Sequence, residues 1–108
     1  VFWALAAFEF GHGSRFQGIP LGENCGMLFM FPDSRQRSFW MRNTKIPLSI
    51  AYADKNGRII NIEDMEPYSE RRVLSRGPAA CALEMNQGWF RKHGVNPGDI
   101  IQGLRVIK

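Results

Sequence analysis

The chain has 108 residues, the length of one domain, and residues 1–108 are treated as a single domain. Hydrophobic residues make up 44% of it, enough for a core, which excludes a disordered chain. The net charge of +4 is spread over small basic groups and is too weak to favour a nucleic-acid partner. No stretch approaches the roughly 20 apolar residues of a membrane span, so no transmembrane segment is predicted.

The first third of the chain favours strands around a long loop. "VFWALAAF" is expected to form a first strand that is apolar on both faces. "FGHGSRFQGIPLGENCG" is typical of a glycine-rich loop. "MLFMF" and "QRSFWM" follow as two strands, and the "PDS" between them signals a turn. We therefore expect these two strands to form a hairpin.

The middle of the chain carries its strongest local signal. "PLSIAYAD" alternates between two faces, as a half-buried strand does, and "RIINIEDM" follows it. The "DKNG" between them supplies the positive φ angles that a tight hairpin needs. Residues 47–53 are therefore predicted to pair antiparallel with residues 58–64 across the Asn56-Gly57 turn.

The last third predicts a crossing loop, "EPYSERRVLSRGP", with an extended piece near Val73 and Leu74, and then the strand "AACALEM". In "NQGWFRKHG", Asn86 can cap a short helix near residues 87–93, and Gly94 can take the left-handed position after it. "IIQGLRVIK" ends the chain as a strand. The fold class is therefore all-β: a compact antiparallel sandwich or barrel-like domain with one short helix.

The residues that usually carry catalysis are sparse. His12 and His93 are the two histidines, and neither sits in the context of a nucleophile. Cys25 and Cys81 form no CxxC, offer too few ligands for zinc, and are predicted not to be bridged. The acidic run "EDME" would split across two faces of a strand. No catalytic residue, metal ligand or cofactor is assigned.

Two segments join polar groups to apolar strands, "FWMRNT" and "LEMNQGW". Such aromatic rings, amides and one carboxylate suit a small polar ligand, but they also suit a polar corner with a purely structural role. Trp40 and Asn43 are expected to stand close to Glu84 and Asn86. We expect the Asn43 amide to bond the backbone or Glu84, which would make it structural first. The candidate ligand-binding residues are Trp40, Met41, Asn43, Thr44, Glu84, Asn86 and Trp89.

Three blocks, "GMLFMF", "SFWMRNTKIPLSIAYADKNGRII" and "LEMNQGWFRKHGVNPGD", resemble the signature blocks of the bacterial and archaeal domain of unknown function 192 (DUF192) over residues 26–108. The resemblance implies a compact, mostly β fold and often an export signal or lipoprotein anchor upstream, hence an extracytoplasmic place, periplasmic or secreted. It implies no established activity. Two departures stand out: Ser49 where the family usually has Asp, and residues 1–25, which match poorly.

Three functions are open on this basis. The first is a non-catalytic extracytoplasmic module that binds a small polar ligand or a protein partner. The second is a hydrolase centred on Glu84, with Arg42 or His93 beside it. The third is a binder of nucleic acid or of an anionic surface, which requires several arginines to converge on one face: Arg71, Arg72, Arg76 and Arg91.

Overall fold

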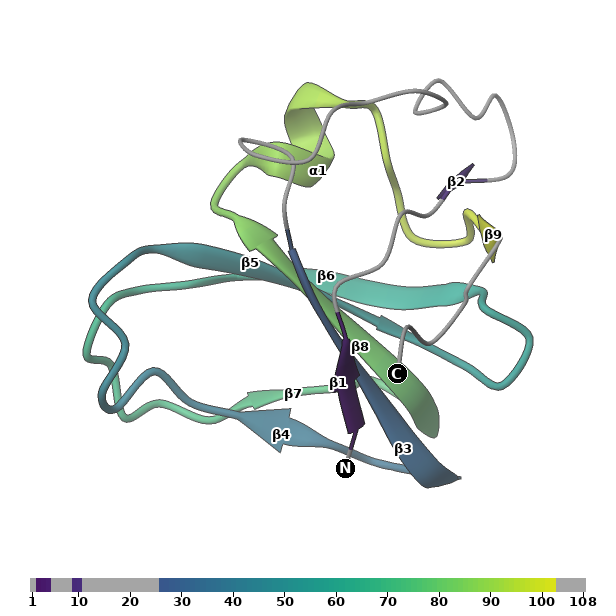
Figure 1. Cartoon of the computed structure of the whole chain (residues 1–108), viewed down its shortest axis with the longest axis horizontal. Coiled ribbons are helices and arrows are strands. Elements are labelled where there is room, and N and C mark those ends of the chain that lie inside the picture. Colours follow the sequence, from purple (N-terminus) through teal and green to yellow (C-terminus); the bar gives the residue numbers. More distant parts are fainter. Residues whose placement is uncertain (1, 5–8, 11–25, 103–108) are drawn as a thin grey trace.

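The computed structural model describes residues 2–4, 9–10 and 26–102 (Figure 1). The elements follow in the order β1 (Phe2–Ala4), β2 (Glu9–Phe10), β3 (Met27–Arg35), β4 (Ser38–Phe39), β5 (Leu48–Ala53), β6 (Ile59–Met65), β7 (Val73–Leu74), β8 (Ala79–Asn86), α1 (Trp89–Lys92) and β9 (Ile101–Gln102).

One antiparallel sheet of five strands, in the order β1-β3-β8-β5-β6, forms the centre of the molecule. Two short ribbons, β4 with β7 and β2 with β9, accompany it. The predicted mostly-β antiparallel fold is confirmed. The described strands do not close on themselves, so the barrel-like form of that prediction does not apply.

The predicted central hairpin is confirmed. β5 pairs antiparallel with β6 from Leu48 opposite Met65 to Ala53 opposite Ile59. In the turn, Gly57 has a φ of 82°, and Asp54 Oδ1 accepts hydrogen bonds from two backbone N–H groups at 2.9 and 3.0 Å. The short-range signal of "DKNG" was therefore sufficient to define this pair.

The predicted hairpin between "MLFMF" and "QRSFWM" is wrong. β3 continues through Pro32 to Arg35, and its register with β8 shifts between Met30 and Arg35. Proline is tolerated at such an irregularity because the ladder there requires no N–H. β4 instead pairs with β7, which lies where the extended piece near residues 73–74 was expected.

The short helix is confirmed at Trp89–Lys92, but its start differs from the prediction. Asn86 ends β8, and Gly88, with a φ of 85°, occupies the N-cap without a side-chain hydrogen bond. Gly94 has the expected positive φ, 69°. The turn at Gly88 directs the helix onto one face of the sheet.

Each face of the sheet has its own core. On the first face, Leu28, Ala51 and Leu83 pack under α1 and the segment that leads to Ile101. On the second face, Ile50 and Tyr52 pack under the β4–β7 ribbon. Figure 1 shows α1 and this ribbon on opposite sides of the sheet.

Cys81 is a buried free thiol, and burial raises its pKa to about 11. Cys25 lies outside the described residues, so the absence of a bridge between the two stays a prediction. Among the described residues, no helix is long and apolar enough to cross a membrane.

Candidate functional site: a pocket around Glu84

Three adjacent strands place Glu84. It lies near the end of β8, opposite Met27 of β3 and opposite Ile50 of β5. Because side chains alternate along a strand, Glu84 shares the second face of the sheet with Ile50 and Phe29. A carboxyl group is thereby directed to the side that the β4–β7 ribbon covers.

A pocket of about 560 Å³ opens at this place. Most of its lining is apolar, and its polar side chains are Thr44, Glu84 and Asn86. The lining consists of Gly26, Met27, Phe29, Phe39, Trp40, Thr44, Ile46, Leu48, Glu84, Met85 and Asn86.

Aromatic rings form one wall of the pocket. The rings of Phe29 and Phe39 meet edge to face, with their centroids 4.9 Å apart. Phe39 also lies 6.1 Å from Tyr52, whose hydroxyl donates a 2.6 Å hydrogen bond to the Val73 carbonyl. The second core thus holds this wall in position, because such pairs favour a definite geometry.

Glu84 is the one ionisable residue in the lining. Its side chain forms no hydrogen bond and no ion pair with the described part of the chain. Burial disfavours its charged form and raises its pKa to about 7. This half-buried carboxyl group thus lacks, among the described residues, the partners that buried polar groups normally have.

The rim of the pocket is apolar. Met27, Trp40 and Ile46 are all exposed there, each by more than two fifths. The guanidinium carbons of Arg42 and Arg72 lie 5.5 and 5.1 Å from the centre of the Trp40 ring. Neither arginine lines the pocket itself, so both affect it through their contact with Trp40.

Of the seven candidate residues, the structure brings four to this pocket: Trp40, Thr44, Glu84 and Asn86. Met41 is instead 2% exposed in the second core, where it fills space. Trp89 is buried in the first core, on the other face of the sheet, against Phe90 and His93.

Asn43 does not have the role that the sequence suggested. It is exposed, does not line the pocket, and forms no side-chain hydrogen bond with the described residues. The expectation that its amide is a structural anchor is therefore wrong. The segment turns at this point through backbone bonds instead, from Thr44 N to Met41 O at 3.1 Å and from Tyr68 N to Thr44 O at 3.1 Å.

Sequence reasoning missed the apolar lining. The signal was present in "GMLFMF", where residues two apart share a face. Met27 and Phe29 therefore face the pocket, while Leu28 faces the first core. Leu48 carried the same signal in "PLSIAYAD", where it shares a face with Ile50. Phe39 carried no such signal because its position depends on the contact between β4 and β7.

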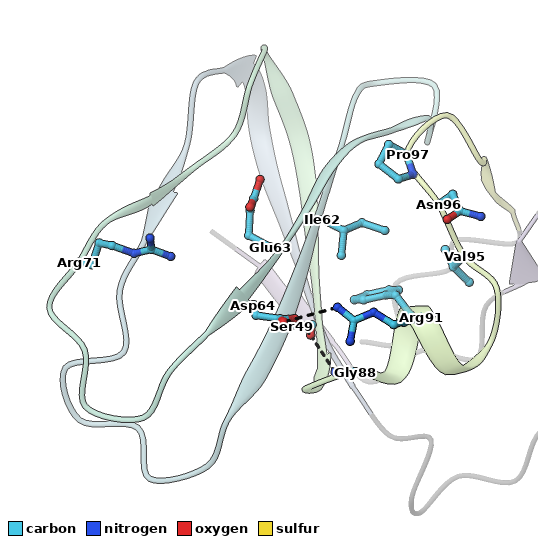
Figure 2. A pocket seen from close by; sticks show the side chains of 11 residues that line it. Ser49, Ile62, Glu63, Asp64, Arg71, Gly88, Arg91, Val95, Asn96 and Pro97 are labelled. Atoms are coloured by element: carbon cyan, nitrogen blue, oxygen red, sulfur yellow. Dashed lines mark hydrogen bonds and ion pairs between the residues drawn. The ribbon is translucent and has the colours of Figure 1, made fainter.

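A second pocket, of about 470 Å³, lies on the other side of the hairpin (Figure 2). Ser49 Oγ donates to Asp64 Oδ1 at 2.7 Å and accepts from the Gly88 N–H at 3.1 Å. Arg91 lies 3.8 Å from Asp64 Oδ2. Ser49, at the position where the family usually has Asp, thus ties two strands to the start of α1.

The acidic run "EDME" separates as expected. Glu63 lies opposite Ile50 and Asp64 opposite Ser49, so the two carboxylates are on different faces. Within residues 2–4, 9–10 and 26–102, no group of three or more His, Cys, Asp or Glu side chains is placed to hold a metal ion.

Residues 14–103 match the model of a protein family, DUF192, described as "Uncharacterized ACR". The chain belongs to this family. The DUF192 match covers most of the chain and includes the three segments that line the Glu84 pocket. No curated protein matches the chain.

Two solved structures resemble this DUF192 domain, each with a TM-score of 0.72 over 80% of the chain. One is a candidate transcription regulator from Sinorhizobium meliloti 1021, 37% identical, and the other is a protein of unknown function from Novosphingobium aromaticivorans DSM 12444, 36% identical. The chain spans 67% and 62% of the lengths of these two proteins.

Proposed function

We propose that this DUF192 domain is a non-catalytic, extracytoplasmic module that binds a small ligand in the Glu84 pocket. The ligand would place an apolar body against the aromatic wall and a polar group against the carboxyl. The observation that carries the proposal is a Glu84 side chain in an apolar pocket, without a partner among the described residues. The extracytoplasmic location is taken from the family resemblance alone.

The dimensions of the pocket support a small molecule. Ligand sites usually measure roughly 300–1,000 Å³ and combine an apolar lining with a few polar groups that fix orientation. The Glu84 pocket, at about 560 Å³ with three polar side chains, has this character. A protein partner would need a larger contact surface.

A structural role for the same polar groups has less support. Asn61, on the same side of the sheet, is 3% exposed and takes part in three hydrogen bonds, one to Glu63 within β6 and two that join β6 to Leu74 of β7 and to Arg76 after it. Glu84 forms no comparable bond with the described residues. A polar side chain with a structural role normally has its hydrogen-bond partners within the protein. One that binds a ligand can lack a partner until the ligand is bound.

A hydrolase is the second candidate, because a carboxyl group with a pKa of about 7 in a cleft suits general acid–base work. The residues expected beside Glu84 do not line its pocket. Arg42 pairs with Glu70 at 3.5 Å, and His93 lies against Trp89 in the first core. The one hydroxyl of the lining belongs to Thr44, which has no base besides Glu84, so binding is the better supported function.

Nucleic-acid binding is supported least. The four arginines that would have to converge are occupied in different places. Arg76 pairs with Glu63 at 3.4 Å, Arg72 stacks on Trp40, and Arg91 pairs with Asp64 in the second pocket, which Arg71 also lines.

The proposal is tested by a thermal-shift screen of small metabolites, followed by two-dimensional NMR of the hits. A ligand at one hundred times its dissociation constant stabilises by about 2.7 kcal/mol, which is readily measured. We expect hits to shift the resonances of Trp40, Thr44 and Asn86. Glu84→Gln should weaken the binding of the hits. Glu66→Gln, which changes an exposed carboxylate outside the pocket, should leave their binding unchanged.

A screen in which no hit shifts the pocket resonances would contradict the binding function. Hits that are cleaved at a rate that depends on Glu84 would favour the hydrolase. The proposed location is tested separately by fractionating cells that express the natural full-length protein, where recovery in the cytoplasm alone would contradict it.

A further inference from the structure

We propose that the ligand of the Glu84 pocket is a small organic monocation, with its ammonium group against the Glu84 carboxylate and its apolar body against Phe29, Phe39 and Trp40. This inference rests on the proposed binding function and adds the chemical class of the ligand.

Charge complementarity is the first reason. Glu84 is the one ionisable group that lines the pocket, and it has neither an ion-pair partner nor a hydrogen-bond donor among the described residues. A carboxylate withdrawn from water is stabilised by a cation that also donates hydrogen bonds. An ammonium group supplies both the positive charge and the N–H donors.

The aromatic wall is the second reason. Phe29, Phe39 and Trp40 line the same pocket as the carboxylate. The faces of such rings attract cations, and the attraction grows when water is excluded. Aromatic rings beside one carboxylate thus suit an ammonium group better than an alcohol or an acid of the same length.

The two arginines beside Trp40 favour a ligand with only one positive charge. Arg42 and Arg72 already lie over the Trp40 ring. A second ammonium at the outer end of the ligand would face these guanidinium groups and be repelled. The outer end of the ligand is therefore neutral or negative.

The surroundings of Glu84 make the binding dependent on pH. From β5, Tyr52 faces it, and burial followed by the charge of Glu84 raises the pKa of this phenol, which keeps it neutral. From β6, Glu63 lies on the same side but bonds to Asn61. The residues of β3 that line the pocket, Met27 and Phe29, are uncharged, and Asp33 and Arg35 of the same strand pair with each other outside the lining. Arg42 and Arg72 lie against Trp40, and Arg76 pairs with Glu63.

Glu84 is therefore the group whose protonation competes with the cation. Below its pKa, the ligand must displace a proton, so affinity falls about tenfold for each pH unit. With a pKa of about 7, a cation should bind about 30-fold more tightly at pH 8.5 than at pH 5.5. A neutral ligand should show no such gain.

The experiment compares three probes of equal length, hexylammonium, hexanol and hexanoate, by NMR titration of the protein at pH 5.5, 7.0 and 8.5. We expect hexylammonium to bind most tightly at pH 8.5, with shifts in the resonances of Trp40 and Thr44. Its affinity should be about 30-fold lower at pH 5.5. Glu84→Gln should remove the preference for hexylammonium over hexanol, and Glu66→Gln should leave it unchanged.

A second measurement uses the unaltered protein, in case Glu84→Gln does not fold. Calorimetry near pH 6 in two buffers of different ionisation enthalpy should show the release of about one proton for each hexylammonium bound, and none for hexanol.

Different results would contradict the monocation ligand and the binding function. Tighter binding of hexanol or hexanoate in the pocket would overturn the monocation and leave the binding function standing. Hexylammonium binding that does not depend on pH or releases no proton would also overturn the monocation. No shift at the pocket with any probe would overturn both.

Discussion

Two polar side chains on the same side of the sheet differ in what they bond to. Asn61 donates to the Leu74 carbonyl at 3.1 Å and accepts from the Arg76 N–H at 3.0 Å, which fastens the segment after β7 to the sheet. Glu84 forms no bond of this kind in the described part of the chain. The first side chain stabilises the fold, whereas the second has no partner among the described residues, which is why we propose that it meets a ligand.

At the residue scale, Glu84→Gln should change how stability depends on pH. Its pKa is about 7 in the folded protein and about 4.3 when unfolded, so the folded state favours the protonated form. The contribution of Glu84 to the free energy of unfolding is fully present below the unfolded pKa and is lost as the pH rises through about 7. The loss should be about 3–4 kcal/mol by pH 9.

Urea denaturation at pH 4, 7 and 9 measures this effect. We expect the free energy of unfolding of Glu84→Gln to improve relative to the unaltered protein as pH rises. A constant difference between the two proteins at the three pH values would contradict a raised pKa at Glu84.

Asn43 and Asn61 form a matched pair of substitutions. Asn43→Ala should leave the free energy of unfolding within about 0.5 kcal/mol, because its side chain is exposed and bonds to none of the described residues. Asn61→Ala should lose about 1–3 kcal/mol, because a buried amide is removed and the Leu74 carbonyl and the Arg76 N–H lose their partner. Thermal melts of both variants check this, and an equal loss in the two would refute the assignment.

At the element scale, structures that depend on neighbouring residues could be predicted and those that depend on distant ones could not. The β5–β6 hairpin and α1 follow from local signals, the Asn-Gly turn and the "NQGWFRKHG" pattern. β4 pairs with β7, so Ser38 lies opposite Leu74 across a long stretch of chain. No turn residue signals such a contact, so the sequence predicted that β4 would pair with the nearer strand, β3.

Gly57 and Gly94 test the hairpin turn as a matched pair. Both have positive φ, 82° and 69°, so alanine strains both backbones alike. A Cβ at Gly57 would also lie 2.7 Å from the Ile101 carbonyl oxygen, whereas none of the described atoms lies within 4 Å of a Cβ at Gly94. We expect Gly57→Ala to cost at least about 1 kcal/mol more than Gly94→Ala in chemical denaturation. Equal costs would show that the turn does not press on the Ile101 backbone.

At the scale of the whole molecule, both faces of the sheet are covered, but by different elements. The first face is closed by α1, whereas the β4–β7 ribbon leaves the Glu84 pocket open beside it. The sequence pointed to Trp40 and Glu84 because polar and aromatic groups joined core strands. It misplaced Trp89 because the turn at Gly88 carries α1 to the other face, which no pattern of spacing indicates.

The proposed function depends on Glu84 holding a titratable carboxyl group in an apolar pocket. It is tested by an NMR titration of the Glu84 side-chain carboxyl carbon from pH 3 to 10, with the signal assigned by its loss in Glu84→Gln. We expect a midpoint near 7, which should fall when hexylammonium is present because the cation favours the ionised form. A midpoint near the ordinary glutamate pKa of about 4.3, unchanged by hexylammonium, would contradict this role of Glu84.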